Sequence, residues 1–164
     1  MPEEKGTSSV EFKKSAIRFL ITVGVCFLIF KFIIPSYVVR EESMVPTMYE
    51  GDRILLNVFS EPKREDIVIF SDSDYGALIK RVIAEPKDKC VVKDGALYVN
   101  GKFTEKDSGI FKGEFTVPKD KYIVMGDNRS VSLDSRAFGY VSRERFKGKV
   151  LVRMWPLNKV GLVK

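Results

Sequence analysis

An apolar run near the start of the chain limits its fold more than any other feature. The run covers residues 16–34, a length of 19 residues, and a helix needs about 20 such residues to cross a bilayer. Its charged residues are Arg18 and Lys31, one near each end, where long side chains can reach lipid headgroups. No small-x-small motif follows it, although a removable signal peptide would require one. We therefore predict a retained transmembrane anchor, the alternative being a buried core helix.

Positive residues on either side of the run predict its orientation. Lysine and arginine are more frequent before its core than shortly after it: Lys5, Lys13, Lys14 and Arg18 precede it, and Arg40 and Arg53 follow. Positively charged flanks remain in the cytoplasm. We therefore expect a single-pass protein with residues 1–15 in the cytoplasm, the anchor at 16–34, and a domain at 35–164 on the far side of the membrane.

The rest of the chain shows the pattern of short β-strands. Runs rich in branched residues alternate with turn signals such as Lys93-Asp94-Gly95 and Asn100-Gly101. The predicted strands are residues 52–58, 66–70, 77–84, 90–92, 96–99, 121–125, 149–155 and 160–162. Residues 142–146 can form one helical turn, and residues 104–116 are expected to be a loop or an irregular hairpin. The predicted fold is mostly β, with one N-terminal transmembrane helix followed by an all-β domain.

Composition excludes several kinds of chemistry. The chain has no histidine, so it contains neither a histidine-based catalytic triad nor a histidine-bearing zinc site. Its two cysteines are too few for a thiolate metal site, and we expect no metal and no cofactor. The net charge of +6 is spread over strand-like segments, which favours anionic lipid over nucleic acid as a partner. A hydrolase of this composition must use Lys, Asp, Glu or Tyr as its base.

A serine follows the apolar run in a setting poorly suited to a helix interior. Pro46 cannot continue a helix, and it pushes the residue before it towards extended geometry. Ser43, three residues earlier, is therefore expected in an extended or turn segment that presents its hydroxyl. Alone, this pattern is a weak signal of catalysis.

A lysine is embedded in the apolar segment 77–84. Spacing alone favours an ordinary solvent-facing strand lysine at Lys80. If Lys80 is instead buried beside aliphatic side chains, desolvation lowers its pKa. A neutral lysine can take the proton of a serine hydroxyl, and in a chain without histidine this is the well-precedented way to activate Ser43.

The third segment of interest is residues 126–139, which are poor in aliphatic side chains although strand-like segments lie on both sides. Its first residues, Gly126-Asp127-Asn128, are typical of a turn. Asp134 and Arg136 stand two residues apart and can form an ion pair. The alternative to a functional role for residues 126–139 is an ordinary polar loop closed by this salt bridge.

Together these segments resemble the bacterial type I signal peptidases, over essentially the whole chain. The matching stretches are Ser43-Met44 with Pro46-Thr47, Lys80-Arg81-Val82, residues 126–139, the apolar run, Gly51-Asp52, Lys93-Asp94-Gly95 and Tyr98-Val99-Asn100-Gly101. The resemblance implies a serine endopeptidase anchored in the bacterial cytoplasmic membrane, with its all-β domain on the outer face. Such an enzyme removes signal peptides from exported preproteins after small-x-small motifs.

The resemblance also implies roles for individual residues. Ser43 would be the nucleophile, Lys80 the general base, and Ser132 a neutral hydrogen-bond partner that orients the lysine amine. Asp134 and Arg136 would form a supporting ion pair. Candidate walls of the pockets for the substrate's −1 and −3 side chains are Tyr37, Val39, Met44, Met48, Leu78 and Ile79. The expected partners are secreted preproteins and a phospholipid membrane, with no cofactor and no nucleic acid, and the expected state is a monomer.

One position departs from the family pattern. Some members place a hydroxyl that helps to bind the oxyanion two residues before the nucleophile, and this chain has Glu41 there. A carboxylate aimed at a developing oxyanion is harmful, so we expect Glu41 to point away from the site.

Two other classes of protein fit parts of the sequence. The self-cleaving repressors share a Ser-Lys dyad and a related β-fold, but they carry a DNA-binding helical domain where this chain has its apolar run. A non-catalytic, membrane-anchored β-domain fits the composition. It does not account for the joint occurrence of Ser43, Lys80 and Ser132 in their motifs.

Overall fold

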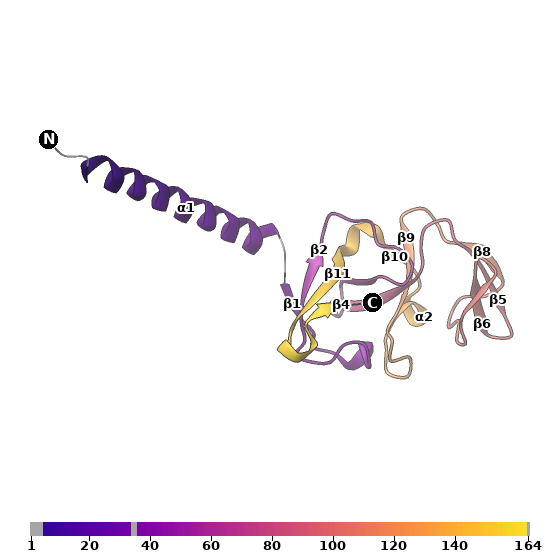
Figure 1. Ribbon diagram of the computed structural model, residues 1–164. Helices are drawn as coiled ribbons and strands as arrows, with labels where there is room; N and C mark the ends of the chain where they lie inside the picture. Colours follow the sequence, from indigo (N-terminus) through magenta and orange to yellow (C-terminus); the bar gives the residue numbers. More distant parts are fainter. Residues whose placement is uncertain (1–4, 34–35, 164) are drawn as a thin grey trace. The chain divides into compact units, whose positions relative to one another are not determined.

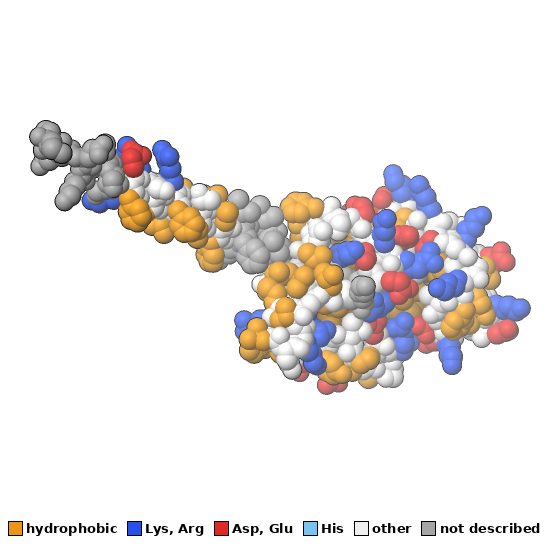
Figure 2. Space-filling view, in the orientation of Figure 1, with side chains coloured by type: hydrophobic (Ala, Val, Ile, Leu, Met, Phe, Trp, Pro, Cys, Tyr) orange, Lys and Arg blue, Asp and Glu red, His pale blue; other side chains and the backbone are white. Residues whose placement is uncertain are grey.

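The computed structural model describes residues 5–33 and 36–163, with side chains for residues 11–28 and 36–163. The chain divides into two units, with the boundary between Pro35 and Ser36. Helix α1 (Lys5–Ile33) belongs to the first unit (Figure 1). Figure 2 shows hydrophobic side chains along its described part and charged ones towards its N-terminal end.

The membrane-anchor prediction falls partly on α1. Within the described residues, no helix combines the length and the apolar character needed to cross a membrane. Residues 29–34 of the predicted anchor lie outside the residues whose side chains are described.

Within residues 36–163, the second unit is built mainly on β-strands joined by loops, with one short α-helix and three 3₁₀-helices (Figure 1). In chain order, its elements are β1 (Ser36–Val38), η1 (Glu42–Met44), β2 (Arg53–Asn57), β3 (Ile67–Asp72), β4 (Gly76–Ala84), β5 (Lys89–Lys93), β6 (Ala96–Val99), β7 (Lys102–Glu105), β8 (Glu114–Thr116), β9 (Lys121–Met125), α2 (Ser135–Phe138), β10 (Val141–Ser142), η2 (Arg143–Arg145), β11 (Phe146–Trp155), η3 (Leu157–Lys159) and β12 (Gly161–Leu162). The three η elements are short 3₁₀-helices.

These strands form two antiparallel sheets. The larger sheet has the order β1-β2-β11-β3-β4-β9-β10, with β12 paired to β11, and the smaller has the order β7-β6-β5-β8. Strand β4 is an inner strand, with β3 on one side and β9 on the other. An inner strand forms backbone hydrogen bonds on both of its edges, so the Cα positions in its middle are well fixed.

Three apolar clusters hold the sheets together. One packs the buried side chains of β2 and β3 against Met44 and Met48, which follow the predicted nucleophile and are both fully buried. Burying a methionine side chain contributes about 1.5–3 kcal/mol. The second cluster includes Leu97 of the smaller sheet and Ile123 of the larger one, and the third surrounds Phe70. The core therefore fixes the segment that carries Ser43 against the larger sheet.

Most of the predicted strands are confirmed, within a few residues at their ends. The predicted helical turn is confirmed as η2. The prediction of an irregular segment at 104–116 is wrong at both ends, because β7 extends to Glu105 and β8 begins at Glu114. These short strands form through pairing with β6 and β5, which the local sequence pattern does not reveal.

Candidate active site

Ser43 and Lys80 lie in direct contact in the folded domain. Lys80 Nζ donates a hydrogen bond to Ser43 Oγ at 2.8 Å. Ser43 is 6% exposed and Lys80 is 1% exposed, so the solvent-facing alternative for Lys80 is wrong. Burial lowers the pKa of the Lys80 amine, although the nearby carboxylates of Glu41 and Asp134 act in the opposite direction. The geometry thus pairs a serine hydroxyl with an amine that loses its proton more easily than a solvated lysine.

The backbone around Ser43 is held by short-range and long-range hydrogen bonds. Helix η1 ends at Met44, and the N–H of Val45 donates to the Glu42 carbonyl at 3.1 Å. Pro46 follows, as expected for a segment that does not continue as a helix. The carbonyl of Ser43 accepts from the N–H of Asn128 at 2.9 Å. The segment that carries Ser43 is therefore joined directly to residues 126–139.

A half-buried ion pair between Arg81 and Asp127 connects all three sequence segments, and no sequence pattern predicted it. Asp127 accepts from Arg81 Nε at 2.8 Å and Nη2 at 2.6 Å, and from the Thr47 hydroxyl at 2.5 Å. Burial alone would raise the pKa of Asp127, but the bonds from Arg81 and Thr47 hold it below its ordinary value. Arg81 adjoins Lys80 in β4, so this contact fixes the strand that carries Lys80 relative to the segment that carries Ser43.

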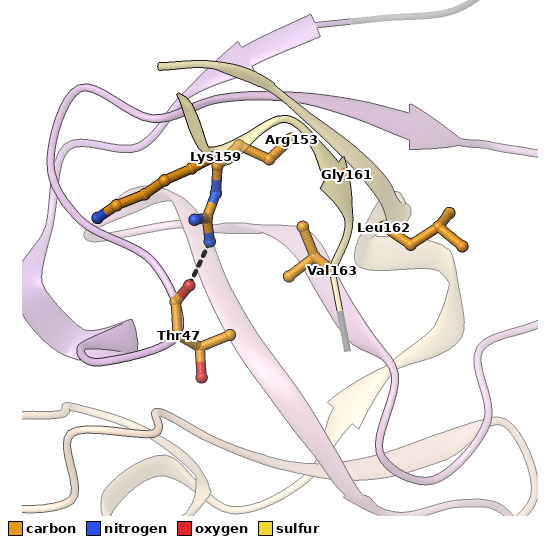
Figure 3. A pocket seen from close by; sticks show the side chains of 6 residues that line it. All are labelled: Thr47, Arg153, Lys159, Gly161, Leu162 and Val163. Atoms are coloured by element: carbon orange, nitrogen blue, oxygen red, sulfur yellow. Dashed lines mark hydrogen bonds between the residues drawn. The ribbon is translucent and has the colours of Figure 1, made fainter. Parts of the chain in front are cut away.

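Thr47 makes a second contact through its backbone carbonyl. The guanidinium of Arg153 on β11 donates to the Thr47 carbonyl (Figure 3). Its Nε lies 3.0 Å from a carboxylate oxygen of Asp52. A cavity of about 200 Å³ adjoins this contact, lined by Thr47, Arg153, Lys159, Gly161, Leu162 and Val163. Neither Ser43 nor Lys80 lines it, so this cavity lies outside the candidate catalytic site.

Ser132 occupies a different position from the expected one. Its hydroxyl accepts from the N–H of Gly126 at 3.1 Å and donates to the Asp134 carboxylate. Among the hydrogen bonds of the described residues, none joins Ser132 to Lys80. The reason is local: the absence of a side chain at Gly126 lets the Ser132 side chain pack onto it, and the Ser132 hydroxyl donates its hydrogen bond to the Asp134 carboxylate.

Asp134 and Arg136 form a two-point ion pair. Arg136 Nε lies 2.9 Å from Asp134 Oδ1, and Nη2 lies 3.0 Å from Oδ2. The fully buried Asp134 carboxylate also accepts from the N–H of Gly126 and caps α2 through the N–H of Arg136. Burial opposes ionisation, but hydrogen bonds from Arg136 and Ser132 hold the pKa of Asp134 below its ordinary value. The pair therefore fixes residues 126–139 to the end of β9.

Glu41 lies against the candidate dyad, so the expectation that it points away is wrong. Its Oε2 is 3.6 Å from Lys80 Nζ, and the Ser43 hydroxyl donates to the same oxygen at 3.4 Å. The physical reason is charge and hydrogen bonding, because the Lys80 amine and the Ser43 hydroxyl both offer N–H or O–H groups to the Glu41 carboxylate.

A groove begins beside Glu41 and contains most of the predicted pocket residues. Its volume is about 530 Å³, and Tyr37, Val39, Leu78 and Ile79 line it together with Ser36, Val38, Arg40, Glu41, Ile54, Ile69, Tyr75, Gly76 and Ala77. Met44 and Met48 are fully buried in the core and do not line this groove, contrary to the prediction. The groove has a mixed lining, with aliphatic side chains beside the charged ones of Arg40 and Glu41.

Comparisons with known proteins give a consistent result. A family model described as signal peptidase, peptidase S26, matches residues 12–155. Signal peptidase IB of Staphylococcus aureus (strain Mu50) is 34% identical over 178 residues, covering 90% of this chain and 93% of that protein. A probable signal peptidase I-2 of Synechocystis is 36% identical over 148 residues, covering 80% and 68%. A crystal structure of a signal peptidase I from Enterococcus faecalis is 30% identical, with a TM-score of 0.43, covering 55% of this chain and 97% of that chain.

Proposed function

This chain belongs to the signal peptidase family, peptidase S26, and from that membership we propose that it removes N-terminal signal peptides from exported preproteins with a Ser43-Lys80 dyad. The observation that carries the choice of dyad is the 2.8 Å hydrogen bond between Lys80 Nζ and Ser43 Oγ. The absence of histidine removes the usual general base of a serine hydrolase.

The proposed reaction is acyl transfer through the serine. Neutral Lys80 accepts the hydroxyl proton as Ser43 Oγ attacks the carbonyl of the last signal-peptide residue, and the protonated lysine then gives that proton to the leaving amine. Water hydrolyses the acyl-enzyme with Lys80 again as base. The backbone N–H of Ser43 is the proposed donor to the oxyanion.

Ser132, Asp134 and Arg136 are proposed as positioning residues. Ser132 and Asp134 both bind the N–H of Gly126, next to the Ser43 carbonyl. Arg136 holds the Asp134 carboxylate from the other side. We propose that these contacts keep the nucleophile segment at the correct distance from Lys80.

The groove predicts the substrate's side-chain preference. A preprotein segment lying extended along it would direct alternate side chains into the space bounded by Tyr37, Val39, Leu78 and Ile79. Replacing alanine by phenylalanine at the −1 position of a peptide substrate should lower kcat/KM about 10- to 100-fold, because overfilling a packed apolar site is costly. A serine at −1 serves as the matched small control. Equal cleavage of the alanine and phenylalanine peptides would contradict the proposed binding mode.

We propose further that residues 16–34 anchor the enzyme in the cytoplasmic membrane of a bacterium. Several large apolar side chains of the helix are exposed within the described residues, including Phe19, Leu20 and Phe27. The distribution of Lys and Arg supports a cytoplasmic segment at 1–15 and a catalytic domain at 35–164 on the outer face. The proposed enzyme acts as a monomer, needs no cofactor and binds no nucleic acid.

The proposed anchor leads to a prediction about substrate form. Residues 35–42 join the apolar run to Ser43, and eight residues span at most about 26–29 Å. Confining enzyme and preprotein to one surface raises their effective concentration. A fragment that begins at Ser36 should therefore cleave membrane-inserted preprotein roughly 100-fold more slowly than the full chain, while both cleave a short soluble peptide at similar rates. If the fragment matches the full chain on both substrates, the anchor does not position the site.

A further inference from the structure

The position of Glu41 has a chemical consequence that the proposed reaction does not use. The two hydrogen bonds at the dyad run in one direction, from Lys80 Nζ to Ser43 Oγ and from the Ser43 hydroxyl to Glu41 Oε2. A serine hydroxyl has only one proton. When the Ser43 hydroxyl donates its hydrogen bond to Glu41, its proton does not point at Lys80. Lys80 is then the donor in the hydrogen bond between its amine and Ser43 Oγ. In this arrangement no hydroxyl proton faces the Lys80 amine, so the lysine is not placed to act as base.

The charges around Lys80 favour the same state. The carboxylates that face its amine are Glu41, from the segment before η1, and Asp134, from the loop before α2. Asp134 is fully buried and neutralised by Arg136. Among the described residues, the ion-pair partner of Glu41 is Lys80 alone. Glu41 is therefore the carboxylate that specifically stabilises the ammonium form.

The surroundings of Glu41 allow its side chain to move away from Lys80 and Ser43. Its side chain is 44% exposed, whereas that of Lys80 is 1% exposed. Glu41 also lines the groove in which the preprotein segment is proposed to bind, beside Leu78 and Ile79. A peptide backbone brought to the Ser43 hydroxyl must occupy the space next to that hydroxyl, and the Glu41 carboxylate is already there. The carboxylate can turn to water without disturbing the core.

We propose that Glu41 holds the free dyad in its unreactive, protonated form, and that a bound preprotein displaces the carboxylate and releases Lys80 to act as base. The inference rests on the proposed function for the identity of the displacing ligand. It makes Glu41 a control residue at the site rather than a contributor to oxyanion binding. In such an enzyme the serine becomes reactive only when a substrate occupies the groove.

The test compares the full chain with its Glu41→Gln variant, using Glu42→Gln as the control. Glu42 is the neighbouring carboxylate, and its side chain is exposed. The pH dependence of kcat/KM reports the free enzyme, and that of kcat reports the enzyme-substrate complex. In wild type, the acid limb of kcat/KM should lie at higher pH than that of kcat. In Glu41→Gln the kcat/KM limb should move to lower pH, which raises kcat/KM below the limb by about three- to tenfold, and the gap between the two limbs should narrow.

A second measurement does not depend on cleavage. The titration of Lys80, followed by NMR of labelled lysine in the full chain in detergent micelles, should move to lower pH in Glu41→Gln and remain unchanged in Glu42→Gln. Coincident Lys80 titrations in wild type and Glu41→Gln would overturn the inference, as would a kcat/KM limb displaced to higher pH or activity lost at every pH. If wild type itself cleaves no preprotein, a Lys80 titration that is shifted in Glu41→Gln supports the effect of Glu41 and rejects the proposed function instead.

Discussion

Replacing Lys80 by methionine is expected to reduce preprotein cleavage by at least roughly 10⁴-fold, because removing one member of a catalytic unit costs about as much as removing the whole unit. Methionine fills most of the space of the lysine side chain and removes only the amine, so the packing around β4 is kept. The Ser43→Ala variant should lose a similar factor, and the double variant should be no worse than either single one. The measurement is kcat on a signal-peptide substrate, alongside thermal unfolding.

The control for this prediction is Lys93→Ala, which removes an exposed lysine from the smaller sheet. Its kcat should equal that of wild type. The Lys80→Met protein should unfold at a temperature no lower than wild type, since removing a buried amine relieves a desolvation cost. Appreciable turnover by a well-folded Lys80→Met protein would show that another group serves as base.

The Gly126→Ala variant is expected to lose about 100-fold or more in kcat, although it adds only a methyl group. A Cβ at this position would lie 2.3 Å from Ser132 Oγ and 2.5 Å from the carbonyl oxygen of Ser43. The serine side chain can turn away, but the Ser43 carbonyl is backbone and must move with the nucleophile. A displacement of about 1 Å at a reacting group can cost 100-fold in rate.

Two further variants separate this effect from a general loss of stability. Gly161→Ala adds a methyl group where nothing lies within 4 Å and should retain full kcat. Adding Ser132→Gly to Gly126→Ala removes the first close contact and leaves the second, so kcat should stay low. Recovery of kcat in the double variant would mean that Ser132, not the Ser43 backbone, is the group that Gly126 accommodates.

Local sequence patterns were sufficient to predict most of the β-strands. Runs of branched residues set the strands, and turn residues such as Asp94 and Gly95 set the hairpin between β5 and β6. The same patterns did not reveal β7 and β8 as strands, because these short segments are extended only where a neighbouring strand pairs with them. Nor did they show α2, a single turn whose start depends on the Asp134 side chain.

The residues of the candidate site were predictable from the sequence, but most of the contacts between them were not. The missing histidine and the two motifs drew attention to Ser43 and Lys80, which the fold places in contact. The contact of Asp127 with Arg81 and Thr47 spans 46 and 80 residues of sequence, and no local period records such a pairing. The direction of the Glu41 side chain follows from which charges are near in space, and that is a property of the assembled site.

The two members of the proposed dyad belong to parts of the fold that should differ in persistence. Lys80 lies on β4, an inner strand that pairs with β3 and, from Arg81 onward, with β9, whereas Ser43 lies on a 3₁₀-helix of three residues. Local openings start in segments with few backbone bonds and reach inner strands only near global unfolding. Amide hydrogen exchange around Ser43 should accordingly be faster than along β4. Mild denaturant would then separate the serine from its base while the sheet is still intact, so that peptidase activity disappears before the protein unfolds.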